Sequence, residues 1–85
     1  MVVLVSLMPK AFVFINTVPE FMSQVLEEIR RIEGVEEAET VYGNYDIVVK
    51  VETETMDQLK RIVTFKIRML PKVLTTNSLL VVPPE

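Results

Sequence analysis

Two short polar clusters interrupt an otherwise apolar sequence and hold residue types that could bind a small molecule. The first is Gly43-Asn44-Tyr45-Asp46 and the second is Thr75-Thr76-Asn77-Ser78. Backbone N–H groups and hydroxyls would bind a carboxylate, whereas carbonyl groups or the side chain of Asp46 would bind an ammonium group. Taken singly, a surface turn explains the first cluster and a half-exposed strand explains the second. Together, with apolar neighbours, they predict a pocket for a zwitterion.

Catalysis has little support in the sequence. The chain has no cysteine and no histidine, which excludes thiol nucleophiles, disulfides, serine–histidine catalysis and histidine-bound zinc or haem. Asp46 is the one carboxylate beside apolar residues at a turn, and no second carboxylate lies at a short fixed spacing from it. We therefore expect no catalytic residue, no metal site and no cofactor. A small barrel enzyme of unknown reaction remains the least favoured alternative.

The composition predicts one domain with an additional buried surface. An 85-residue chain with 49% hydrophobic residues has more apolar surface than a small monomer buries, so a subunit interface is expected. The longest apolar run near the start covers residues 1–5 and is too short to cross a bilayer. We expect a cytoplasmic protein that makes no membrane contact.

Direct DNA binding is not expected. The net charge is −3, whereas a DNA-binding domain usually carries a basic surface. A basic group does occur, and it is interpreted as the solvated side and C-terminal end of a helix. Its members are Lys60, Arg61, Lys66, Arg68 and Lys72. The six glutamates between positions 27 and 39 would repel a duplex.

Hydrophobic periodicity predicts the element order βαββαβ. Strands are expected over residues 11–17, 35–42, 45–52 and 73–82. The first helix is expected to begin near Pro19 and to end at Gly34, and the second to begin at a Thr55–Gln58 capping box and to end at Pro71. A tight Gly43-Asn44 turn would join the two middle strands. This order is typical of the α+β ferredoxin-like fold, a four-stranded antiparallel sheet with two helices on one face.

The helices of such a fold leave one face of the sheet bare, and here that face would be apolar. Two alternative sets of side chains could form it. They are Phe12, Phe14, Val48 and Leu80, or Val13, Ile15, Val49 and Leu79. Burial at about 25 cal/mol per Å² favours pairing with a second copy, so a homodimer interface is expected there. Residues 1–10 are interpreted as an N-terminal extension that could form an extra strand, and residues 11–85 as the ligand-binding domain.

Five segments carry a further pattern in a fixed order. They are Ala11-Phe12-Val13-Phe14-Ile15, Ile32-x-Gly34-Val35, Val41-x-Gly43-x-Tyr45-Asp46, Lys66-Ile67-Arg68-x-Leu70-Pro71-x-Val73 and Thr76-x-Ser78. Over residues 11–82 this pattern resembles the small-molecule-binding domain, or RAM domain, of the Lrp/AsnC family. The chain departs from the family at Ser78, where a second threonine is usual, and at Lys72, where glycine often precedes the valine.

The resemblance implies a dimeric α+β barrel whose dimers assemble into an octameric or decameric ring. It also implies an amino acid or related effector bound between neighbouring dimers, near residues 43–46 and 75–78. Full-length members carry an N-terminal helix-turn-helix domain, which ten leading residues cannot encode. The chain therefore resembles a stand-alone effector domain, acting alone or with a full-length Lrp/AsnC regulator. The alternative is an interaction module that forms mixed oligomers and has lost ligand binding.

Overall fold

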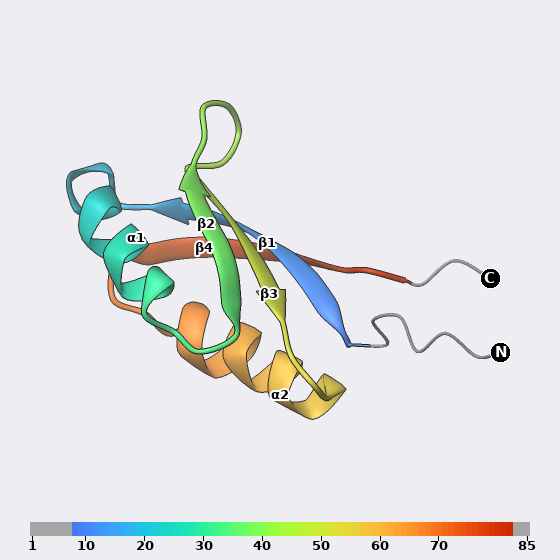
Figure 1. The fold of residues 1–85 in the computed structure, drawn as a ribbon. Coiled ribbons are helices and arrows are strands. Elements are labelled where there is room, and N and C mark those ends of the chain that lie inside the picture. Colours follow the sequence, from blue (N-terminus) through green and yellow to red (C-terminus); the bar gives the residue numbers. More distant parts are fainter. Residues whose placement is uncertain (1–7, 83–85) are drawn as a thin grey trace, which may run out of the picture.

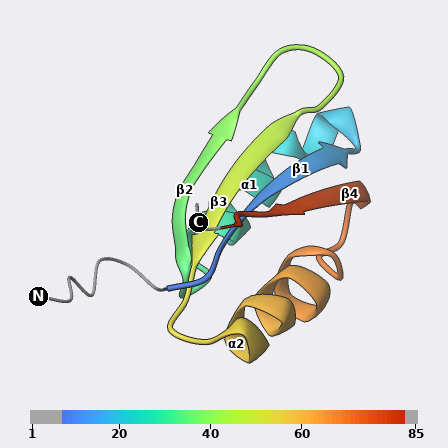
Figure 2. The same ribbon diagram turned by 90° about the vertical axis from the view of Figure 1, so that its right-hand side faces the viewer.

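The computed structural model describes residues 8–82. The elements are β1 (Lys10–Thr17), the 3-10 helix η1 (Pro19–Phe21), α1 (Met22–Arg30), β2 (Val35–Thr40), β3 (Ile47–Glu52), α2 (Met56–Arg61), the π-helix η2 (Ile62–Ile67) and β4 (Val73–Leu80). The strands form one antiparallel sheet in the order β2-β3-β1-β4 (Figures 1 and 2). The predicted ferredoxin-like α+β fold is confirmed. Residues 1–7 of the N-terminal extension, and Pro83 and Pro84 after β4, lie outside the described residues.

The core lies between one face of the sheet and the two helices. Alternate residues of β1 and β3 are fully buried, because successive side chains of a strand point to opposite faces. They are Ala11, Val13, Ile15, Ile47, Val49 and Val51. These side chains belong to one hydrophobic cluster with Val25 and Ile29 of α1, Leu59 of α2 and Ile67 of η2. In Figure 2 α1 lies behind the strands, so the face turned to the viewer is the one without helices.

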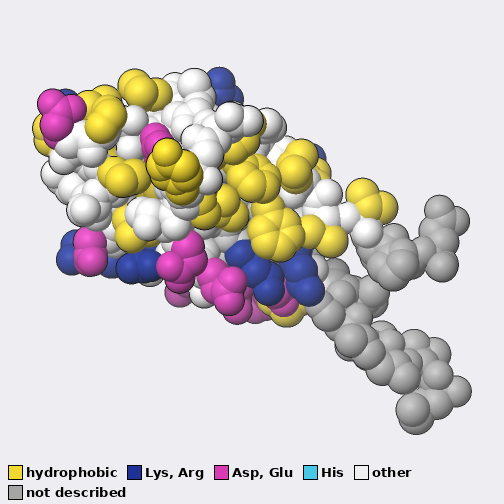
Figure 3. All heavy atoms as spheres, turned by 90° about the horizontal axis from the view of Figure 1, so that it is seen from above, with side chains coloured by type: hydrophobic (Ala, Val, Ile, Leu, Met, Phe, Trp, Pro, Cys, Tyr) yellow, Lys and Arg dark blue, Asp and Glu magenta, His cyan; other side chains and the backbone are white. Residues whose placement is uncertain are grey.

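The strand register identifies the apolar residues of this uncovered face. Phe12 pairs with Leu79 and Phe14 pairs with Val48, and residues paired in register share a face. Leu80 pairs with Ala11 and therefore lies on the helix side, so the expected set is corrected at this position. The consecutive apolar residues that end β4 show no alternation from which the face could be predicted. Seen from above, hydrophobic side chains gather over the middle of the molecule and charged ones follow one border (Figure 3).

The connection between β2 and β3 is longer than the predicted two-residue turn. The Val41 N–H donates to the Asp46 carbonyl at 2.9 Å, which closes a loop that projects beyond the sheet (Figure 1). The Asp46 N–H donates to the Ile15 carbonyl at 2.9 Å, so the chain joins β1 before β3 begins. Tyr45 consequently lies in the loop and does not continue the buried stripe of Ile47, which corrects the expected strand start.

Both helix starts follow the local sequence. The Gln58 N–H donates to Thr55 Oγ1 at 3.1 Å, and the Thr55 N–H donates to Gln58 Oε1 at 3.2 Å. This reciprocal pair is the predicted capping box. Pro19 occupies the first turn of η1, where a missing N–H costs no hydrogen bond. These two predictions are confirmed.

Both helix ends differ from the prediction. The α1 helix ends at Arg30 rather than at Gly34, because the Ile32 N–H donates to the Ile29 carbonyl at 3.0 Å and tightens the chain into a turn. The second helix leaves α geometry before Pro71. Its Arg68 N–H donates to the Val63 carbonyl at 3.2 Å, five residues earlier, as in a π-helix. Such π turns are frequent at functional sites.

The two glycines provide a matched test of how closely Gly34 packs against Ile62. Gly34 has a φ of +101°, and a Cβ there would lie 2.5 Å from Ile62 Cδ1, whereas Gly43 has a φ of +146° and open space around it. We expect Gly43→Ala to lower the free energy of unfolding by about 1–2 kcal/mol through backbone strain alone. Gly34→Ala should lower it by about 1–3 kcal/mol, since the end of the Ile62 side chain must also move aside. Urea denaturation measures both, and a larger loss for Gly43→Ala would contradict the contact between Gly34 and Ile62.

Candidate ligand-binding site

The structure brings Tyr45 of the first polar cluster to Asn77 of the second. Asn77 Nδ2 donates to Tyr45 Oη at 3.0 Å, and the Tyr45 and Phe14 ring centroids are 5.2 Å apart. Phe14 also pairs with Asn77 in the β1–β4 register. These three side chains therefore form a small polar and aromatic group on the uncovered face, at the end of the sheet from which the loop projects.

Asp46 holds the loop to the end of β1. Its Oδ2 accepts a hydrogen bond from the Thr17 N–H at 2.9 Å. The β1–β4 register shifts between Asn16 and Thr17, so this N–H lies at an irregular position. The side chain of Asp46 therefore has a structural hydrogen-bond partner within its own chain.

The second cluster divides between the two faces of the sheet. Thr75 pairs with Asn16, and Asn16 Nδ2 donates to Thr75 Oγ1 at 3.1 Å. Thr76 and Ser78 pair instead with Ile15 and Val13, two core residues. Thr75 and Asn77 therefore belong to the uncovered face, whereas Thr76 and Ser78 belong to the helix side.

A cavity of about 610 Å³ lies along the β4 edge of the sheet. Hydroxyl, cationic and apolar side chains share its wall. They are Val63, Thr64, Arg68, Met69, Val73, Leu74, Thr75, Thr76 and Ser78. Val63 and Thr64 belong to η2, and they line the cavity together with residues of β4. Because its wall combines a guanidinium and several hydroxyls with apolar side chains, the cavity is chemically compatible with a small molecule that has a carboxylate and an apolar portion.

The eight predicted binding residues do not form one pocket within a protomer. Thr75, Thr76 and Ser78 line the cavity, while Tyr45 and Asn77 lie together on the uncovered face. Gly43 and Asn44 are exposed in the projecting loop. Arg68 and Thr64, which are outside the predicted set, also line the cavity. Arg68 is exposed, which agrees with its interpretation as one of the solvated basic residues, and nothing in the local sequence distinguishes it from the other members of that group.

A second cavity lies between the end of α1 and the start of the second helix. Its volume is about 760 Å³, and its wall carries charges of both signs, among them Glu28, Arg31, Glu33, Arg61 and Lys66. It contains none of the predicted binding residues.

Within residues 8–82, no group of three acidic side chains could hold a metal ion. In the same part of the chain, no helix is long and apolar enough to span a membrane.

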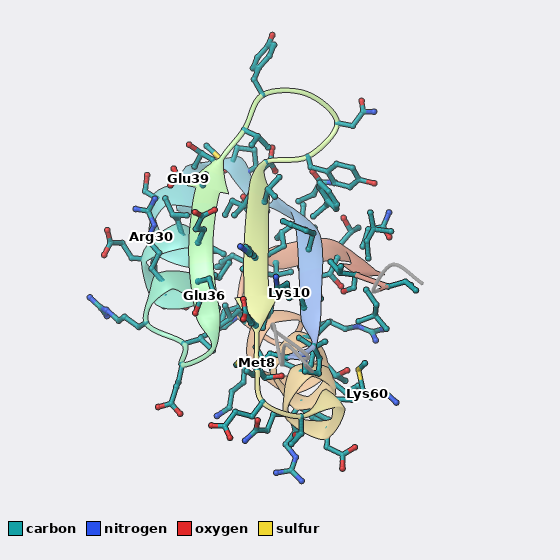
Figure 4. All side chains as sticks on the ribbon, turned by 45° about the vertical axis from the view of Figure 1, so that its right-hand side comes forward. Met8, Lys10, Arg30, Glu36, Glu39 and Lys60 are labelled. Carbon is teal, nitrogen blue, oxygen red and sulfur yellow. The ribbon has the colours of Figure 1, made fainter. Side chains whose placement is uncertain are left out.

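Arg30 closes part of the outer edge of the sheet at β2. Its Nε and Nη2 donate to the Ala38 carbonyl at 3.0 and 2.7 Å, and Nη2 lies 3.5 Å from Glu39 Oε2 (Figure 4). The guanidinium thus occupies a backbone acceptor that another strand would need. At the opposite edge, the β4 sequence VLTTNSLL has no charged residue. Charged edges resist strand addition, so the two edges differ in their capacity to contact another molecule.

The fold defines a small α+β domain with a cavity beside β4, and comparison with known proteins identifies its family. The model of the Lrp/AsnC ligand-binding domain matches residues 10–83. The chain therefore belongs to the Lrp/AsnC ligand-binding domain family, which confirms the resemblance found in the sequence. No curated protein matches the chain.

Two solved structures show the likeness over nearly the whole chain. FFRP-DM1 is 36% identical with a TM-score of 0.84, and the match covers 88% of this chain and 100% of that one. The hypothetical protein PHS023 from Pyrococcus horikoshii is 35% identical with a TM-score of 0.83, covering 91% and 93%. The transcriptional regulator NMB0573 from Neisseria meningitidis, solved as a complex with L-Met, shares the fold at 16% identity and a TM-score of 0.80. That match covers 98% of this chain and 58% of the regulator.

The contact of Asp46 with Thr17 leads to a test that needs no ligand. Asp46→Ala should lower the free energy of unfolding by about 1–3 kcal/mol, because the part-buried Thr17 N–H loses its acceptor. Asp46→Asn keeps an acceptor oxygen and should cost less than half of that. Chemical denaturation of the three proteins measures the difference. An unchanged stability of Asp46→Ala would contradict the structural role.

Proposed function

We propose that this chain is an effector-binding domain of the Lrp/AsnC type that binds an amino acid or a related metabolite and modulates transcription through its assembly. The observation that carries this proposal is the cavity beside β4, found in a chain whose family is defined by ligand binding. The complex of NMB0573 with L-Met supports an amino acid as the ligand class. The proposed role is binding rather than catalysis.

In this proposal different side chains of the cavity bind different parts of the ligand. Arg68 would pair with the ligand carboxylate, with the hydroxyls of Thr76 and Ser78 as further donors. Met69 and Leu74, which are 69% and 61% exposed, would cover the apolar portion of the ligand. The cavity wall includes no carboxylate. The partner of the ligand ammonium group would therefore come from another copy, and the projecting loop of residues 43–46 supplies carbonyl groups and Asp46.

Two kinds of contact between copies are proposed. Phe12, Phe14, Val48 and Leu79 would bury the uncovered face against a second copy, forming a homodimer. The loop between β2 and β3 would contact the β4 cavity of a neighbouring dimer, so that dimers join into an octameric or decameric ring. Tyr42 at the loop is fully exposed, as expected for a side chain with a partner in an assembly.

A second candidate is an interaction module that binds no ligand and joins a full-length Lrp/AsnC regulator. Exposed apolar side chains favour it, since Met69 and Leu74 of the cavity wall are 69% and 61% exposed and Phe65 of η2 is 67% exposed. Apolar groups of this size are typical of protein contacts. The two candidates differ in whether a small molecule stabilises the protein.

Effector binding is tested by thermal unfolding with a panel of amino acids. A ligand at about 100 times its dissociation constant should add about 2.7 kcal/mol to the bound form, a rise in melting temperature on the order of 10 °C for a domain of this size. Arg68→Met should remove most of this rise, whereas Lys60→Met, outside the cavity, should leave it unchanged. No rise with any member of the panel, and no change in oligomer size, would favour the interaction module.

Substitutions at two adjacent leucines test the proposed homodimer. Leu79→Asp places a charge on the uncovered face and should convert the dimer to a monomer at micromolar concentration, because a buried unpaired charge is costly. Leu80→Asp alters the helix side of the same strand and should leave the dimer intact. Sedimentation velocity measures both. A monomeric native protein would contradict the proposed interface.

A further inference from the structure

The second cavity, between the end of α1 and the start of the second helix, shares no lining residue with the cavity beside β4. We propose that it binds a small molecule with a carboxylate at one end, an ammonium group at the other and an alkyl chain between them. An ω-amino acid is the simplest molecule of this class. The site is separate from the proposed effector site and does not depend on it.

One wall of the second cavity is mainly negative. It comes from the end of α1, the turn that follows and the start of β2. Glu28, Glu33 and Glu36 outnumber the one cation of this wall, Arg31. The C-terminal end of α1 adds partial negative charge from its last carbonyl groups. This wall therefore favours the ammonium end of a ligand.

The other wall is mainly positive and comes from the second helix. Arg61 and Lys66 line the cavity from this helix, and Glu54, just before it, is the one carboxylate on this side. Glu52 also borders the cavity, but it pairs with Lys10 in the β1–β3 register, so its side chain points to the uncovered face of the sheet. The helix wall therefore favours a carboxylate.

The charges of the two walls do not neutralise each other across the cavity. The one salt bridge within residues 8–82 joins Arg30 to Glu39, and neither residue lines this cavity. No carboxylate of one wall thus contacts a cation of the other wall in the described part of the chain. Both signs of charge are available to a ligand, and a molecule with two opposite charges can pair with both walls at once.

The side chain of Gln58 is oriented by the capping box. Its Oε1 accepts hydrogen bonds from the N–H groups of Glu54 and Thr55, both at 3.2 Å. Because only the amide oxygen can accept these bonds, the position of Nε2 is fixed as well, and its N–H groups remain available as donors. Gln58 lines the cavity on the same side as Arg61 and Lys66. It is a further donor for the carboxylate end of the ligand.

The cavity also has an apolar surface. Ile32 and Ile62 line it, and both are half-buried against the hydrophobic core. Gly34 also lines it, next to Ile62. An alkyl chain that covers these side chains removes apolar surface from water. The volume of about 760 Å³ is typical of small-molecule sites.

Thermal unfolding with ω-amino acids tests this site. The probes are 4-aminobutyrate, 6-aminohexanoate and 8-aminooctanoate at fixed ionic strength, because their charged ends have different separations. At least one of them should raise the melting temperature with increasing concentration. The carboxylate and the amine of the same chain length, which have one charge each, should bind at least about tenfold more weakly. No rise with any of the probes, or equal binding of a singly charged analogue, would overturn the proposal.

Gln58→Glu is the most specific variant, since a capping box accepts either residue. It should keep the stability of the protein without a probe, and it should weaken probe binding about tenfold or more, because a carboxylate replaces the amide donor. Arg61→Met should weaken binding about fivefold or more. Lys60→Met removes a charge from the same helix outside the cavity (Figure 4) and should change binding less than about twofold. Native binding in Gln58→Glu or in Arg61→Met, or an equal loss in Lys60→Met, would contradict the site.

The same assay distinguishes this site from the cavity beside β4. If Arg68→Met removes the rise given by the ω-amino acid and Arg61→Met does not, the probe binds beside β4 and the second site is overturned. The amino-acid panel tests the proposed function separately. Failure of the ω-amino acids therefore leaves the proposed effector site standing, and failure of the panel leaves the second site standing.

Discussion

The structure depends on the pairing of β1 with strands on both sides. This strand has β3 at one side and β4 at the other, so it supplies hydrogen bonds to most of the sheet. Its alternation also fixes both surfaces of the sheet, since Ala11, Val13 and Ile15 are completely buried and Phe12 and Phe14 point the other way. With two helices available for one face only, burial of the second face requires another molecule. The proposed homodimer follows from how this strand is built.

The two edges of the sheet assign different contacts to different sides of the molecule. At β2, Arg30 occupies the Ala38 carbonyl, and glutamates follow along the strand. At β4, an uncharged strand borders the cavity that contains Arg68. Because charge and an occupied acceptor oppose strand addition at β2, the β4 side is the more available for a ligand or a neighbouring copy. The proposed ring contact uses that side.

An effector site that is incomplete in one protomer couples ligand binding to assembly. In the proposed function the cavity supplies the groups for a carboxylate, and a loop from another copy supplies those for an ammonium. A ligand that binds such a site stabilises the assembled form by as much as its affinity for that form exceeds its affinity for the separated copies. The two interfaces then have separate tasks. In this proposal the sheet face would hold the dimer, and the β4 side would respond to the ligand.

Local sequence determined the order of elements, the starts of both helices and the family, because apolar periodicity and the Thr55–Gln58 capping box depend on neighbouring residues. The five-segment pattern was likewise readable without coordinates. Tertiary structure decided which side of β4 each residue takes, the length of the loop after β2, and the separation of Thr76 and Ser78 from Asn77. These features depend on the register between β1 and β4, which are distant in the chain, and a shift of one residue exchanges the faces. Arg68 lines the same cavity as Thr75, Thr76 and Ser78, and no local sequence pattern predicts that these residues share a cavity.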